Sequence, residues 1–231
     1  MIKRISTVLL FLFPFSVKAQ ITETITVKAG EDLSAVLSTH GLYKFPAFNS
    51  ATVLFKDGTT TRAKMNFNIF LNDMQFIDNK GDTLVVSNPE LIDSIKFDST
   101  VFYYQKGYLQ VVEDYGSTKL VVQKKISFQP VKKGAFGLSA PGASIDTYGR
   151  LSASFNGINQ LVLNEDIIVT KMTSYIVTYK KYRSATAKRS GFLTAFPEIK
   201  KETQDFIDLN KINFNKEDDL KKLLQFCTQH S

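Results

Sequence analysis

The stretch ATVLFKDGTTTRAKMNFN, residues 51–68, predicts a β-hairpin and decides the fold class of the chain. Its first half is rich in β-branched and aromatic residues, and Asp57-Gly58 is a strong hairpin-turn signal. From Arg62 to Ile69, apolar and polar residues alternate with the period of a half-buried strand. We therefore expect one face to point at the core and the other to point away from it; these faces are Ala63, Met65, Phe67 and Ile69, and Arg62, Lys64, Asn66 and Asn68.

The same pattern continues through residues 51–131, where short apolar runs alternate with turn residues such as Asn79-Lys80-Gly81-Asp82. The linkers are too short for the crossover helices of a parallel sheet. We expect an antiparallel β-meander, curled into a barrel or folded into a sandwich. The expected strands are 52–55, 62–69, 74–77, 83–86, 94–97, 101–104, 108–112 and 119–128.

Segments on either side of the meander extend this prediction. The alternation of apolar and polar residues in Ile21–Val27 predicts a further strand. In residues 31–39, the spacing of Leu33, Val36 and Leu37 fits one short helical turn, but the segment is too brief to assign. Five of the twelve glycines fall in 132–157, which predicts a surface loop or, alternatively, a binding loop. The contacts of such a binding loop would be Phe136, Tyr148 and Phe155, and further strands are expected at 161–163, 167–170 and 174–179.

The pattern changes to helical spacing in a tail that covers residues 184–229. We expect a short helix over 186–196, interrupted by Gly191, and a second helix opened by Pro197. Asn215 is the expected N-cap of the last helix. Its apolar stripe is Leu220, Leu223, Leu224 and Cys227. The expected architecture is mostly β (α+β), one domain over 20–231 with two or three helices packed on it.

Residues 1–19 have the pattern of a secretory signal peptide, with a basic start, a short apolar run and a cleavage site between Ala19 and Gln20. The apolar run is too short to span a bilayer, and no second long run follows. We expect an exported protein of the periplasm or cell surface, without a transmembrane span.

Charge and cysteine content exclude several classes of function. The signal carries three of the 29 basic residues and none of the 22 acidic ones, so the net charge falls from +7 to +4. This charge is too small and too dispersed for a nucleic-acid-binding protein. Cys227 is the single cysteine, so an intrachain disulfide is impossible. We interpret it as a small apolar residue of a buried helix face rather than a redox or nucleophilic group.

No motif for catalysis, a metal or a cofactor is present. His40 and His230 do not form a metal-ligand spacing, and we assign no catalytic, cofactor-binding or metal residues. Adjacent carboxylates such as Glu113-Asp114 would point to opposite faces of a strand. Distant carboxylates that converge in a cleft would still permit a glycan-acting hydrolase, which stays a third hypothesis.

A basic and aromatic segment is the candidate partner-binding surface. No acidic residue occurs between Lys171 and Pro197. Cations interleaved with aromatic rings suit an acidic glycan, a lipid headgroup or an acidic protein, and the alternative is a solvated strand end. The candidate residues are Tyr179, Lys180, Lys181, Tyr182, Arg183, Lys188 and Arg189.

Three stretches carry a family resemblance: VLFKDG at 53–58, AKMNFN at 63–68 and DMQFI at 73–77. Together with the Ala19-Gln20 junction and the C-terminal helices, they resemble uncharacterised exported β-rich proteins of Bacteroidetes-type bacteria. The resemblance implies an envelope location and carries no catalytic residues.

We therefore expect a non-catalytic interaction module of the cell envelope. Its partner would be another envelope protein or an acidic glycan. The alternative is a carrier of a small lipid-like ligand, with a cavity enclosed by the sheet. The sequence leaves the oligomeric state open.

Overall fold

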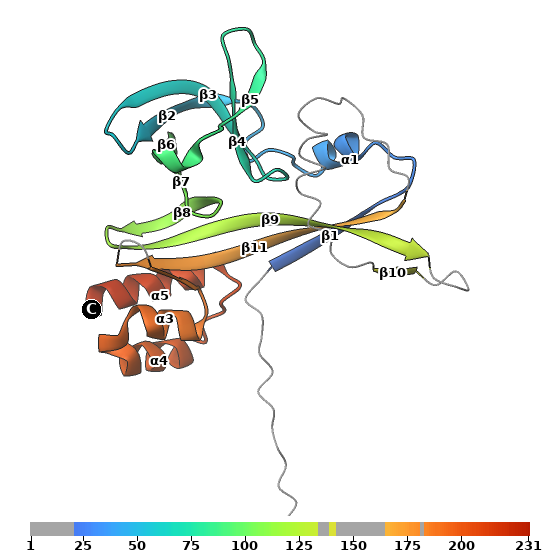
Figure 1. Cartoon of the computed structure of the whole chain (residues 1–231). Helices are drawn as coiled ribbons and strands as arrows, with labels where there is room; N and C mark the ends of the chain where they lie inside the picture. The colour runs from blue at the N-terminus through green and yellow to red at the C-terminus, as the bar shows by residue number, and fades with distance from the viewer. Residues whose placement is uncertain (1–20, 134–138, 142–164, 181–182) are drawn as a thin grey trace, which may run out of the picture.

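The computed structural model describes residues 21–133, 139–141, 165–180 and 183–231, and Figure 1 shows their arrangement. The expected signal peptide, Phe136, Tyr148, Phe155, Lys181, Tyr182 and the expected strand 161–163 lie outside the described residues. The described residues form a 12-stranded sheet. Its strands are β1 (Ile21–Val27), β2 (Asn49–Phe55), β3 (Thr60–Asn68), β4 (Asp73–Ile77), β5 (Thr83–Val85), β6 (Ile92–Phe97), β7 (Thr100–Tyr104), β8 (Tyr108–Tyr115), β9 (Thr118–Lys133), β10 (Ser139–Pro141), β11 (Ile167–Tyr179) and β12 (Arg183–Thr186).

The predicted antiparallel meander is confirmed, but the predicted option of a closed barrel is wrong. The sheet runs in the order β1-β11-β9-β8-β7-β6-β2-β3-β4-β5, and β10 and β12 pair with β9 and β11 off this path. Strands β1 and β5 stand at its two ends and do not pair with each other, so the sheet is open. Closure would require these two end strands to pair in register.

Three helices follow the sheet near the C-terminus, as predicted. These three are α3 (Arg189–Ala195), α4 (Lys200–Leu209) and α5 (Glu217–His230). A further helix, α1 (Leu33–Thr39), follows β1, and there are 3-10 turns at η1 (Pro89–Leu91) and η3 (Pro197–Ile199). The prediction that Asn215 is the N-cap of the last helix is wrong, because Lys216 is the N-cap of α5. Gly191 fits inside α3 because a Cβ there would lie 2.0 Å from the backbone oxygen of Thr186.

One expected break in the sheet is absent. The separate strands predicted at 167–170 and 174–179 form the single strand β11, because Lys171–Thr173 continues the ladder with both neighbours. Strand β9 is also longer than predicted and continues past Phe128 to Lys133. Together β9 and β11 make a long two-stranded ribbon that crosses the molecule, with the C-terminal helices and α1 on different sides of it in Figure 1.

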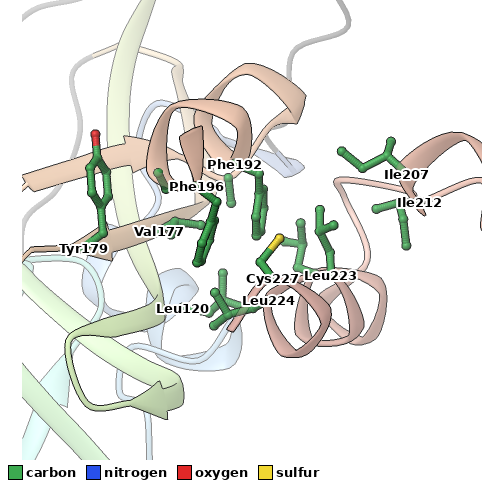
Figure 2. Packing of buried hydrophobic residues seen from close by; sticks show 13 residues of the cluster. Leu120, Val177, Tyr179, Phe192, Phe196, Ile207, Ile212, Leu223, Leu224 and Cys227 are labelled. Carbon is green, nitrogen blue, oxygen red and sulfur yellow. The ribbon is translucent and has the colours of Figure 1, made fainter. Parts of the chain in front are cut away.

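Two apolar clusters lie on the ribbon, and both use the same set of every-second residues: the even-numbered residues of β9 and the odd-numbered residues of β11. Near one end, Leu120 and Val177 are paired across the strands and pack with the C-terminal helices, as Figure 2 shows. Near the other end, Phe128 and Val169 are paired and pack with α1. Residues two apart on a strand share a face, and strand twist turns that face along the ribbon. Between the two clusters the same face carries polar residues, Lys124 on β9 and Lys171 and Thr173 on β11.

A third cluster fills the meander from β2 to β8, and its edge corrects one sequence expectation. Met65 and Phe67 are buried there as expected, but Asn66 and Asn68 are buried too. The Asn66 side chain donates to the backbone oxygens of Phe45 and Ala47 and accepts from the Phe45 N–H. The chain that leads from α1 into β2 therefore covers this face, which places Tyr43 and its neighbours against the sheet.

Candidate functional site

The structure describes five residues of the basic and aromatic surface predicted around residues 179–189: Tyr179, Lys180, Arg183, Lys188 and Arg189. Tyr179 is buried in the helix–sheet cluster, so its ring is not available to a partner (Figure 2). The Arg189 guanidinium binds both carboxylate oxygens of Asp208, which raises the pKa of Arg189 and lowers that of Asp208. Lys188 is half-buried, whereas Lys180 and Arg183 are exposed near the tip of the β11–β12 hairpin.

A different group of cations surrounds a pocket on the ribbon, in the stretch between its two apolar clusters. The pocket has a volume of about 300 Å³, at the lower end of the range for small-molecule sites. It is formed by β1, by the chain that follows α1, by the end of β3, and by the middles of β9 and β11. Its lining residues are Glu23, His40, Gly41, Tyr43, Ile69, Lys124, Lys125, Lys171, Met172 and Thr173.

The strand register explains why these side chains meet. Thr173 of β11 lies opposite Lys124 of β9, and Lys171 lies opposite Glu23 of β1. These four residues belong to the alternating set that carries the apolar clusters on either side. The pocket is therefore a polar interruption in a face that is otherwise covered by helices.

Lys171 joins the sheet to the end of α1. Its Nζ donates to the backbone oxygen of His40 at 2.6 Å and lies 3.6 Å from the Glu23 carboxylate. The Lys171 side chain is only 19% exposed, whereas that of Glu23 is 62% exposed. A lysine at a helix C-terminus satisfies a carbonyl and complements the helix dipole. This contact fixes His40 and Gly41 at the mouth of the pocket.

Lys124 is a partly buried charge of the pocket. Burial lowers its pKa, and the positive charges of Lys44 and Lys171 lower it further. The negative charge of Glu217 acts in the opposite direction. Glu217 already accepts a hydrogen bond from the Tyr175 hydroxyl at 3.1 Å and pairs with Lys221 at 3.1 Å. The ammonium of Lys124 is thus in a site that favours an added negative charge.

The remaining walls are apolar or neutral. Ile69 and the half-buried Tyr43 supply apolar surface. The Tyr43 hydroxyl donates to Gln75 Oε1 at 2.7 Å, and burial raises its pKa. Thr173 adds a hydroxyl beside Lys124. With Lys124, Lys171 and one carboxylate on the same face of the sheet, the pocket suits an anion more than it suits acid–base catalysis by paired carboxylates.

The other residues singled out in the sequence have structural roles. Cys227 is fully buried, burial raises its pKa to about 11, and its Sγ lies 3.6 Å from the Thr203 hydroxyl. The His230 ring stacks on Phe226 at the end of α5. Within residues 21–133, 139–141, 165–180 and 183–231, no three His, Cys, Asp or Glu side chains form a group able to hold a metal ion.

Sequence reasoning missed Lys124 and Lys171, although a signal for both was present. In β9 the positions of Leu120, Val122, Ile126 and Phe128 alternate as an apolar face, and Lys124 interrupts it. In β11 Lys171 and Thr173 interrupt the series of Val169, Tyr175 and Val177 in the same way. A lysine inside an apolar alternation is a useful signal, because burying an ammonium is costly unless something compensates it.

Comparisons with known proteins add no relative: no family model, no curated protein and no solved structure matches this chain. Among the helices of the described residues, none is both long and apolar enough to cross a membrane.

Proposed function

We propose that the protein is an exported, non-catalytic binding module of the cell envelope that takes an anionic ligand in the lysine-lined pocket. The observation that supports anion binding is the convergence of Lys124 and Lys171 on a pocket whose lining holds one carboxylate. Envelope location and export rest on the signal-like segment 1–19 and on the family resemblance. An acidic glycan, expected from the sequence as one kind of partner, is compatible with such a pocket.

Electrostatics supports a binding role because the pocket holds more positive charge than the protein neutralises. An anion beside Lys124 would offset the repulsion from Lys44 and Lys171. Low exposure of the Lys171 side chain reduces screening by salt and water there. Keeping Lys124 protonated in this partly buried site costs the folded protein free energy, and binding of an anion would reduce that cost.

Titration with sodium phosphate and sodium acetate at constant ionic strength tests the proposal, with binding followed by calorimetry or by NMR chemical-shift changes. We expect saturable binding that Lys124→Met weakens at least tenfold. Lys96→Met is the matched control, because Lys96 is an exposed strand lysine of β6 and its loss changes the net charge equally. Equal effects of the two variants on binding would refute an anion site in this pocket.

The exposed pair Lys180 and Arg183 provides a separate test of the partner surface expected from the sequence. It lies seven or more residues along the chain from Thr173, roughly 20 Å in an extended strand, so the pocket and the hairpin tip are distinct. Reversing Lys180, Lys181 and Arg183 to glutamate should remove an envelope partner in a pull-down without lowering thermal stability. A partner retained by this variant would exclude the hairpin tip as its binding surface. A lipid-sized mass bound to the native protein would instead favour the carrier hypothesis.

A further inference from the structure

We propose that the ligand of the lysine-lined pocket is an acidic sugar, such as a hexuronate unit of an acidic glycan, rather than a simple anion. This inference rests on the proposed anion-binding function and adds the chemical class of the ligand. Its starting point is Glu23, the one carboxylate in the pocket, which shares a face of the sheet with Lys124 and Lys171.

Glu23 argues against a ligand that is only an anion. Its carboxylate lies 3.6 Å from Lys171 Nζ, so it would repel a phosphate or acetate bound at the same ammonium. A carboxylate is also a strong acceptor for two or more hydroxyl donors. A ligand that carries a negative group at one end and hydroxyl groups at the other would turn Glu23 from a repulsive neighbour into a binding group.

The pocket has two chemically different sides that match such a ligand. Lys124 and Thr173 are paired across β9 and β11, inside the sheet from β1, and form the cationic side. Glu23 is on β1, outside β11 in the sheet order, and its side chain is largely exposed. An acid group on Lys124 would therefore leave the rest of a sugar ring directed toward Lys171 and Glu23.

The apolar lining and the size of the pocket point to the same class of ligand. Tyr43 and Ile69 give surface for the C–H face of a sugar ring. A volume of about 300 Å³ suits one small molecule and exceeds the needs of an inorganic anion. Thr173 supplies a hydroxyl that both donates and accepts, which suits the alternating donors and acceptors of a sugar.

Titration with four probes tests the assignment: D-glucuronate, D-glucose, acetate and phosphate, at constant ionic strength and followed by NMR chemical shifts. We expect D-glucuronate to bind at least tenfold more tightly than each of the other three. Lys124→Met should weaken D-glucuronate at least tenfold, and Lys96→Met should leave it unchanged.

The variant Glu23→Gln distinguishes the sugar from the anion. It should weaken D-glucuronate severalfold, because the acceptor for the hydroxyls is lost, and tighten acetate and phosphate, because the repulsion is lost. If acetate or phosphate binds as tightly as D-glucuronate, or if Glu23→Gln tightens all three acids, the acidic-sugar assignment is wrong and the anion site stands. If none of the probes binds, the proposed function fails as well.

Discussion

Replacing Leu120 by alanine tests whether the C-terminal helices and the sheet share one core. Leu120 is fully buried in β9 and belongs to the cluster that also contains Val177 of β11 and Leu223 and Leu224 of α5 (Figure 2). On the side of β9 that faces the meander, Leu120 pairs with Glu113 of β8. One side chain thus contacts the helical layer from a strand that also belongs to the meander.

The magnitude follows from the burial of this side chain. Leu→Ala removes three carbons, which at about 0.8 kcal/mol per buried methylene gives roughly 2.4 kcal/mol of lost transfer free energy. The cavity left in a well-packed cluster raises the loss to about 3–4 kcal/mol. For a chain of this size, that corresponds to a decrease in Tm of about 6–15 °C.

Urea unfolding measures the effect, followed by far-UV circular dichroism and by tyrosine fluorescence, since the chain has no tryptophan. We expect one transition, at the same urea concentration for both probes, shifted to lower urea in the variant. Leu209→Ala on α4 is the matched control: Leu209 is 83% exposed, so its loss should change stability by less than about 0.5 kcal/mol. Separate transitions for the two probes, or a loss below about 1 kcal/mol, would refute a shared core.

Three other predictions concern Lys124, Asn66 and Cys227. Lys124→Met, which weakens anion binding, should stabilise the ligand-free protein by roughly 0.5–1 kcal/mol, as measured by urea unfolding against Lys96→Met. The folded pKa of Lys124 is below its unfolded value of about 10.4, so the unfolded chain binds the proton more tightly and wild-type stability should rise with pH between the two values. Lys124→Met should lack that rise, and an equal rise in both proteins would contradict the buried charge. Asn66→Ala should cost about 2–3 kcal/mol, because the backbone N–H of Phe45 and the backbone oxygens of Phe45 and Ala47 lose their partner; an unchanged urea midpoint would show that water replaces it. With a pKa raised to about 11 and full burial, Cys227 should react with a thiol reagent at pH 8 only as fast as the protein unfolds, and rapid labelling of the native state would contradict this placement.

Local patterns in the sequence predicted most of the elements. The Asp57-Gly58 turn joins β2 and β3 in the register expected of a hairpin, and the alternation on β3 buries Met65 and Phe67. The stripe of α5 is fully buried at Leu220, Leu223, Leu224 and Cys227. Hydrophobic periodicity reports which face of an element is buried, and that information is local to the element.

Other features depended on contacts between distant segments. Asn66 is buried because residues 45 and 47 come back to meet its amide, which no local pattern on β3 shows. Strand β11 is continuous because both β1 and β9 pair with Lys171–Thr173, although the polar residues there favour a break. Tyr179 is buried by the helical layer, which removes it from the surface predicted around it.

The sequence by itself determined the antiparallel β class, the positions of the hairpin turns and the helical tail, because backbone propensity and side-chain periodicity act over a few residues. Only the tertiary structure decided that the sheet stays open and that Lys124, Lys171 and Glu23 meet in one pocket. Those residues come from three strands, one of them about a hundred residues earlier in the chain than the next, and the charges interact only after the sheet brings them within several ångströms.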